Sequence, residues 1–147
     1  MIRLDRVSKV FNQGRHNEVW AVRDVSLELE TKGVTVLKGP SGSGKTSLLA
    51  MIGCLSRPSS GRIHLEERTL SNLPERFMTQ VRRSTFGFIF QRFNLIRGLT
   101  VLENVMLPAY PLAPDAGRLR DKALGLLRQF RLEERARNKA EWLSGGE

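Results

Sequence analysis

The chain has 147 residues, of which 40% are hydrophobic and 27% charged, a composition typical of one soluble globular domain with a buried core. It contains no run of about 20 apolar residues, which excludes a membrane-spanning helix, and its first residues predict a cytosolic protein without a secretory signal. The single cysteine, Cys54, excludes an internal disulfide, is typical of a reducing compartment, and is expected to pack in the core.

The formal net charge of +9 raises nucleic acid as a partner, but the distribution of the charge disfavours it. Both halves of the chain share the excess of lysine and arginine, and we find no basic tail. A solvated surface that faces nucleotide and anionic lipid headgroups is the favoured interpretation, and no nucleic-acid partner is expected. His16 and His64 lack partners at metal-ligand spacing, so they predict no metal site built by the protein alone.

The first part of the chain predicts strands. Residues 2–11 and 19–30 alternate apolar and polar side chains, and a polar turn around Gly14 would join them as an antiparallel ribbon. Residues 34–38, "VTVLK", are rich in β-branched side chains and have a glycine on each side, which is typical of a buried strand.

The middle of the chain alternates helix and strand signals. Apolar residues recur at helical spacing in 45–55, and 62–67 predict a short strand. Residues 69–83 indicate a loop that enters a helix opened by Pro74. Residues 86–90, "FGFIF", predict another buried strand, which ends at Gln91.

Everything after Gln91 has a helical pattern. Residues 100–109 predict a helix with Thr100 as its N-cap, and residues 113–138 predict a longer one that Asp115 could cap. The sequence thus predicts an α/β fold in two parts. Residues 1–91 are expected to form an α/β core with an antiparallel β subdomain, and residues 92–147 a helical subdomain.

The clearest motif is a glycine-rich loop between a predicted strand and a predicted helix, which matches G-x-x-x-x-G-K-[ST]. Its glycines free backbone N–H groups to turn toward phosphate oxygens, and the following helix adds its positive N-terminal end. Lys45 is expected to reach the β- and γ-phosphates and the Thr46 hydroxyl to bind Mg²⁺. The candidate phosphate-binding residues are Gly39, Pro40, Ser41, Gly42, Ser43, Gly44, Lys45, Thr46 and Ser47.

Two other classes of nucleotide-binding protein are disfavoured. A GTPase needs an Asn-Lys-x-Asp guanine reader, whereas "NKAE" at 138–141 has Glu in the last position and follows charged residues, so we interpret it as a solvated helix end. A small-molecule kinase uses the same loop, but no feature of the sequence specifies an acceptor site.

Later motifs carry a family resemblance over essentially the whole chain. "FGFIFQ", "LTVLENVMLP" and "LSGGE" follow the loop "GPSGSGKT" in the order found in ATP-binding cassette transporters. The sequence resembles their ATPase subunit, and residues 81–108 look most like the branch for lipoprotein release and macrolide export. The resemblance implies an ATPase that drives export through a membrane permease, bound at the cytoplasmic face of the inner or plasma membrane.

The resemblance also implies roles for further residues. Two copies would pack head to tail as a homodimer and hold ATP between the loop of one copy and Ser144, Gly145 and Gly146 of the other. There the serine supplies a hydroxyl and the glycines allow backbone N–H groups to approach the γ-phosphate. Gln91 matches the glutamine that contacts Mg²⁺ and the attacking water, close to where the permease docks. Phe11 matches the aromatic residue that stacks on adenine.

The family's next motif, an apolar strand ending in Asp-Glu, has no counterpart, because Glu66 and Glu67 correspond to a surface hairpin. We therefore interpret the sequence as the N-terminal portion of a longer subunit that is an ATPase when complete. We expect the 147 residues alone to bind nucleotide poorly, to hydrolyse none and to aggregate. The alternatives are a non-catalytic module that dimerises on ATP and a soluble cassette protein that works without a permease.

Overall fold

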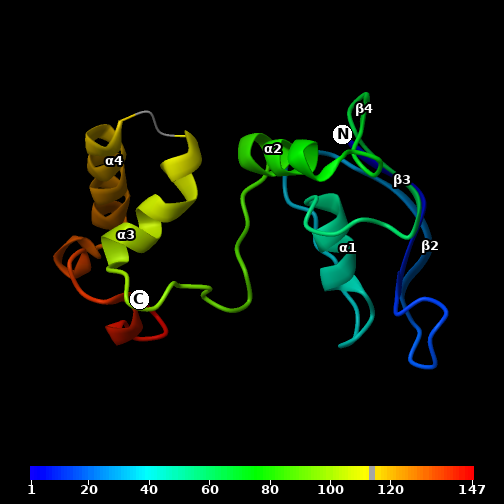
Figure 1. The fold of residues 1–147 in the computed structure, drawn as a ribbon, viewed down its shortest axis with the longest axis horizontal. Coiled ribbons are helices and arrows are strands. Elements are labelled where there is room, and N and C mark those ends of the chain that lie inside the picture. Colours follow the sequence, from blue (N-terminus) through cyan, green and yellow to red (C-terminus); the bar gives the residue numbers. More distant parts are fainter. Residues whose placement is uncertain (113–114) are drawn as a thin grey trace. The chain divides into compact units, whose positions relative to one another are not determined.

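The computed structural model describes residues 1–112 and 115–147 and divides into two compact units, Met1–Phe88 and Ile89–Glu147. The first unit combines a small sheet with helices, and the second contains only helices and irregular segments among its described residues (Figure 1). The predicted α/β class is confirmed. No helix in the described ranges is long and apolar enough to cross a membrane.

The sheet of the first unit is antiparallel throughout. Its strands are β1 (Ile2–Phe11), β2 (Val19–Leu29), β3 (Ser60–Leu65) and β4 (Arg68–Thr69), in the order β2-β1-β3-β4. The predicted ribbon of the first two strands is confirmed. Residues that face each other across it include the pairs Leu4–Leu27 and Phe11–Val19.

One face of this sheet carries the core of the unit. Side chains alternate between the two faces of a strand, so Leu4 and Ile63 point to the same side and are almost fully buried. Helix α1 (Lys45–Ile52) packs there through Met51, which is 2% exposed. Cys54 is 1% exposed, which confirms the packing role, and burial raises the pKa of its thiol.

Helix α2 (Glu75–Thr85) completes this core, and Pro74 precedes its first turn as predicted. Met78 and Val81 lie three residues apart on its buried side. The Arg82 guanidinium ties the helix to the segment after α1, because it donates to the Cys54 carbonyl at 2.6 Å, and within α2 it also donates to the Glu75 carboxylate at 2.8 Å. The bond to Cys54 therefore links α2 to the end of α1.

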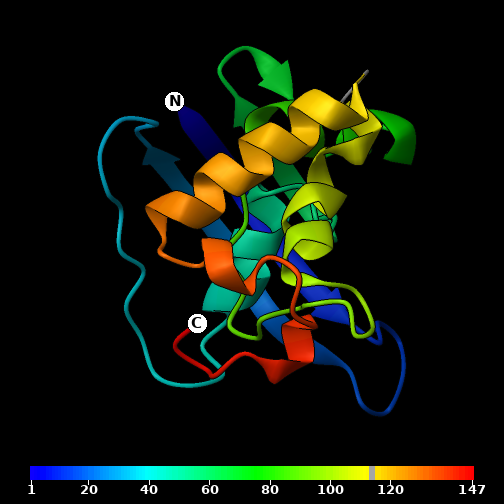
Figure 2. The same cartoon turned by 90° about the vertical axis from the view of Figure 1, so that its left-hand side faces the viewer.

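The predicted strands at 34–38 and 86–90 are wrong. Neither segment forms a helix or strand, and Figure 2 shows the connection from β2 to α1 as an extended trace. A strand needs a neighbour to pair its backbone N–H and C=O groups, and among the described residues the four strands pair only with one another. Val34 is consequently 92% exposed, while Leu37 and Phe86 still pack against the core.

The second unit is built on two helices that lie side by side (Figures 1 and 2). Helix α3 (Val101–Met106) begins with the predicted cap: the Glu103 N–H donates to the Thr100 hydroxyl, and the Glu103 carboxylate accepts from the Thr100 N–H. Helix α4 (Ala116–Gln129) has Asp115 as its N-cap, and the Asp115 carboxylate accepts from two backbone N–H groups. Both predicted N-caps are confirmed.

The predicted helix at 113–138 is shorter in the structure. Its first two predicted residues lie outside the described residues, and α4 ends at Gln129, where Arg131 follows in a left-handed conformation at φ 58°. The helices pack through two small clusters, one around Leu127 and one around Ala123. Three short 3₁₀ helices complete the unit: η1 (Leu107–Leu112), η2 (Glu133–Arg135) and η3 (Ala140–Trp142).

Residues 138–141 do not form the expected solvated helix end. Lys139 pairs with Thr100 in an isolated β-bridge, and the Ala140 N–H donates to the Leu99 carbonyl at 3.1 Å. Ala140 is buried, and the Lys139 ammonium donates to the Gly98 carbonyl at 2.5 Å. The segment therefore braces the chain that leads into α3.

Candidate nucleotide-binding site

The glycine-rich loop lies immediately before α1 and is seated against the sheet. Gly44 is the N-cap of α1 and has φ 87°, a left-handed conformation that side chains disfavour. A Cβ on Gly44 would lie 2.1 Å from the carbonyl oxygen of Ala21 on β2. Only glycine lets the backbone come this close, so the loop geometry depends on this residue. Gly42 also has a positive φ, 79°, but a Cβ there meets nothing within 4 Å.

The Lys45 ammonium lies across the inside of the loop. It donates to the carbonyl oxygens of Gly39 at 2.9 Å and Pro40 at 2.6 Å, and to the Ser43 hydroxyl at 3.2 Å. All three partners are uncharged, so the positive charge of Lys45 is not neutralised within the loop. An anion with strong acceptor oxygens can compete for these donor positions.

The first turn of α1 is equally open to an anion. A helix leaves its first N–H groups without intrahelical partners, and here the N-cap Gly44 has no side chain to cap them, no other described side chain does so, and no acidic residue lies in the first turn. The Thr46 hydroxyl is exposed at the same end. The free N–H groups can donate to phosphate oxygens, and the hydroxyl oxygen is a ligand that a phosphate-bound Mg²⁺ accepts. The described residues contain no cluster of three or more acidic, histidine or cysteine side chains that could hold a metal alone.

Phe11 lies at the end of β1, in the same unit as the loop. Its ring is 44% exposed, and the Lys9 ammonium lies 5.2 Å from the ring centre. Its cross-strand partner is Val19, two residues before the Ala21 carbonyl that the loop contacts. The ring is therefore not a core residue. Trp20, which follows Val19 on β2, is also exposed, at 47%, and its ring stacks on Arg23.

Gln91 and the serine-glycine-glycine stretch belong to the second unit. Gln91 is exposed and lies outside any helix or strand. The Ser144 N–H and hydroxyl both donate to the same Glu147 carboxylate oxygen, at 2.9 and 2.8 Å. These bonds and the Arg135 guanidinium lower the pKa of Glu147. The Phe93 ring lies 3.9 Å from where a Cβ on Gly145 would stand.

The structure thus groups the predicted residues in two sets. Phe11 and residues 39–47 lie in the first unit, and Gln91 and residues 144–146 in the second. Sequence reasoning missed Ala21, whose carbonyl seats the loop, and no sequence signal points to it. It also missed Glu147 as a partner of Ser144, although the spacing S-x-x-E is that of a capping box.

The model of the ABC transporter family matches residues 22–147, and the chain belongs to this family. The macrolide export ATP-binding/permease protein MacB of Hyphomonas neptunium is 40% identical over 147 residues, which cover all of this chain and 23% of MacB. The lipoprotein-releasing system ATP-binding protein LolD of Paramagnetospirillum magneticum is 34% identical over 146 residues, 99% of this chain and 64% of LolD. The predicted resemblance to this branch is confirmed.

A solved structure matches the fold closely. It is the dimeric post-hydrolysis state of the ATP-binding cassette MJ0796 of Methanocaldococcus jannaschii, bound to ADP and Pi, with a TM-score of 0.88 and 37% identity. The match covers 99% of this chain and 64% of that chain. The chain therefore spans less than two thirds of the length of these relatives.

Proposed function

We propose that this chain is the ATP-binding part of an ATPase subunit that drives an export-type ABC transporter. The observation that carries the proposal is the loop before α1, where the Lys45 ammonium has only uncharged partners among the described residues and lies beside an uncapped helix N-terminus. Membership of the ABC transporter family and the relatives named for macrolide export and lipoprotein release support it. The ADP and Pi in the dimeric neighbour support a nucleotide as the ligand.

Each predicted residue then has a defined task. The loop backbone and Lys45 bind the β- and γ-phosphates, and Phe11 stacks on the base. Bound Mg²⁺ would neutralise phosphate charge, with Thr46 and Gln91 as its protein contacts. Thr46 and Phe11 are both exposed, so the Thr46 hydroxyl is open to the metal ion and the Phe11 ring to the base.

Ser144, Gly145 and Gly146 are proposed to bind the ATP held by a second copy in a head-to-tail homodimer. Two Ser144 donors already converge on one carboxylate oxygen, which is the arrangement that a phosphate oxygen requires. The dimeric state of the solved neighbour supports this assembly. A permease is the proposed membrane partner, docked around residues 91–107 on the cytoplasmic face.

Hydrolysis is proposed for the whole protein and not for these residues alone. A base that polarises water is needed, and none of the hydrogen bonds or ion pairs of residues 39–47 in the described structure involves a carboxylate. For these 147 residues alone we expect weak nucleotide binding, no measurable ATP turnover, and aggregation through exposed apolar side chains such as Val34.

The test is a titration with a fluorescent ATP analogue in the presence of Mg²⁺. Lys45→Ala removes charge-assisted hydrogen bonds of about 1.5–3 kcal/mol, so the dissociation constant should rise by about 10- to 100-fold. Lys38→Ala is the matched control, since Lys38 is an exposed lysine just before the loop. Equal affinities of the two variants would contradict the proposed site.

A second measurement separates the ATPase from the two alternatives. In the whole protein, ATP turnover that Gln91→Ala reduces would support an ATPase, whereas ATP-dependent dimerisation without turnover would indicate a non-catalytic module. Copurification with an integral-membrane protein distinguishes a transporter subunit from a cassette that works without a permease. Ser144→Ala should weaken ATP-dependent dimerisation in either case.

A further inference from the structure

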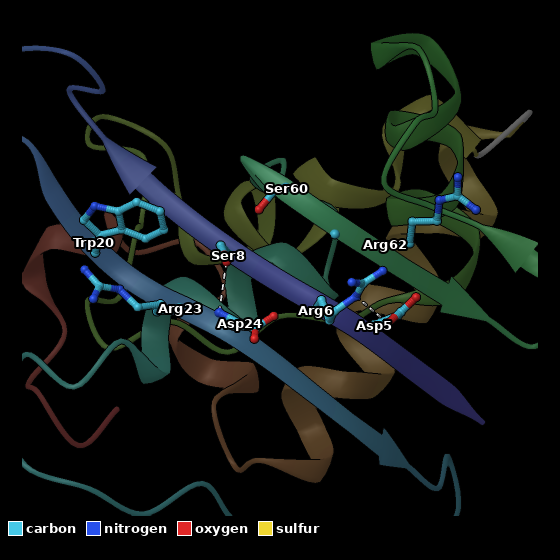
Figure 3. Close-up of a pocket in the computed structure, with 9 residues that line it drawn as sticks. Asp5, Arg6, Ser8, Trp20, Arg23, Asp24, Ser60 and Arg62 are labelled. Carbon is cyan, nitrogen blue, oxygen red and sulfur yellow. Dashed lines mark hydrogen bonds and ion pairs between the residues drawn. The ribbon is translucent and has the colours of Figure 1, made fainter.

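The face of the sheet opposite α1 holds an open groove of about 930 Å³ that the proposed function does not use. Leu4 and Ile63 point into the core, so their neighbours Asp5 and Arg62 point to the other face. Figure 3 shows the groove running across three strands, with Arg23 on β2, Arg6 on β1 and Arg62 on β3. The groove therefore has one guanidinium from each neighbouring strand.

An irregularity shared by the three strands shapes this groove. Arg6 and Asp24 have left-handed backbones at φ 46° and 50°, and the register of β1 shifts between Asp5 and Ser8. A Cβ on Gly61 would lie 2.3 Å from the Arg6 carbonyl oxygen, so glycine is needed there. Because of this bulge, the consecutive residues Asp5 and Arg6 both line the groove, which a regular strand does not allow.

Hydrogen bonds hold the bulge in place. The Arg6 N–H donates to the Ser26 hydroxyl at 2.9 Å, and the Asp24 N–H donates to the Ser8 hydroxyl at 2.9 Å. Ser8 is only 5% exposed, and Figure 3 draws its bond to Asp24 at the centre of the groove. The backbone that carries the arginines is thus ordered before any ligand binds.

The arginines are open to a partner. Arg6 is 3.7 Å from Asp5, a loose pair between exposed side chains. In the part of the chain that the structure describes, neither Arg23 nor Arg62 forms an ion pair, and the Arg23 guanidinium stacks 4.6 Å from the ring of Trp20. The groove therefore combines guanidinium forks, which match carboxylates, with an aromatic surface that suits a nonpolar side chain.

We infer that this groove binds an extended acidic segment of a partner protein. Carboxylates on the segment would pair with Arg6, Arg23 and Arg62, and a nonpolar side chain would rest on Trp20. Asp5 and Asp24 line the same groove and repel a continuous polyanion, so nucleic acid and anionic lipid surfaces fit it less well than a peptide of mixed polarity. The site lies on the sheet face away from the core and is separate from the loop at residues 39–47.

The probe is a fluorescein-labelled peptide that alternates glutamate and serine around one central leucine, and its binding to the whole protein is measured by anisotropy. Arg23→Ala and Arg62→Ala should each weaken binding by about two- to fivefold, the range for exposed ion pairs, and the pair combined by about tenfold. Trp20→Ala should also weaken peptide binding, because it removes the ring on which the leucine rests. Raising the salt concentration should reduce the affinity because the pairs are exposed.

Arg68→Ala is the matched control, because Arg68 is an exposed arginine of the same sheet that does not line the groove. Equal losses of peptide affinity in Arg68→Ala and Arg62→Ala would overturn the inference, because the peptide would then respond to the overall positive charge and not to the groove. Tighter binding of single-stranded DNA or phosphatidylglycerol vesicles than of the peptide would also overturn it. Circular dichroism of each variant checks that the sheet still forms.

A crossed measurement separates this inference from the proposed function. Arg62→Ala should leave binding of the ATP analogue unchanged, and Lys45→Ala should leave binding of the peptide unchanged. Loss of only one activity in each variant identifies two independent sites. Loss of both in either variant would instead indicate that the unit has unfolded, and circular dichroism must show that unfolding for the inference to survive.

Discussion

Replacing Gly44 with alanine tests whether the loop depends on its close contact with β2. The left-handed backbone at φ 87° costs alanine about 1–2 kcal/mol. The new Cβ would also lie 2.1 Å from the Ala21 carbonyl oxygen, and relieving such an overlap costs a further ~1–3 kcal/mol. We therefore expect Gly44→Ala to lower the free energy of unfolding by about 2–5 kcal/mol, a large share of the 5–15 kcal/mol typical of a domain.

Gly42→Ala provides the comparison. Its φ of 79° imposes the same backbone cost, but a Cβ there meets nothing within 4 Å, so we expect a loss of only about 1–2 kcal/mol. Urea unfolding followed by circular dichroism measures both variants, provided that their slopes against denaturant agree. Equal losses would refute the reasoning, since the contact with Ala21 is the only difference it relies on.

Three further predictions concern a core residue, the cap of α3 and the buried cysteine. Met51→Ala should lower the free energy of unfolding by about 2–5 kcal/mol in a urea titration, because Met51 is 2% exposed. The Thr100 N–H and hydroxyl hold the pKa of Glu103 below its ordinary value of 4.5. The ionised carboxylate therefore contributes to the free energy of unfolding above pH 4.5, and this contribution is lost as the pH falls through the lower pKa of the folded chain. The melting temperature of Glu103→Gln should therefore fall less on acidification than that of the unmodified chain. Burial raises the pKa of Cys54 above its ordinary value of 9.0. The neutral thiol therefore contributes to the free energy of unfolding below pH 9.0, and this contribution is lost as the pH rises through the higher pKa of the folded chain. Iodoacetamide, which reacts with the thiolate, should label the folded chain far more slowly than the urea-unfolded one.

Local signals explain what the sequence predicted well. The caps at Thr100 and Asp115 act on backbone groups within three residues, and the ribbon of β1 and β2 alternates apolar and polar side chains over its length. Residues 34–38 have an equally clear strand composition, but a strand also needs a neighbour to pair with, and composition does not show whether one is present.

The candidate site divides in the same way. The loop motif and its helix are local, so residues 39–47 could be recognised from the sequence. The seat of Gly44 against Ala21 is a contact between segments far apart in the chain, and no motif encodes it. The groove could not be predicted from the sequence, because strand alternation places consecutive residues on opposite faces, whereas the bulge places Asp5 and Arg6 on the same face.

Both donors proposed for the γ-phosphate already have internal partners, and this affects how tightly a triphosphate can bind. Lys45 exchanges two carbonyls and a hydroxyl for phosphate oxygens, which adds charge attraction without leaving a charged group behind. Ser144 must instead leave the Glu147 carboxylate, which Arg135 also binds at 3.0 Å. The two halves of the proposed site are therefore unequal: the loop gains charge pairing on binding, whereas the serine-glycine-glycine stretch exchanges one anion for another. Nucleotide capture is then expected to begin at the loop, with the serine of a second copy engaging only after the triphosphate is fixed there.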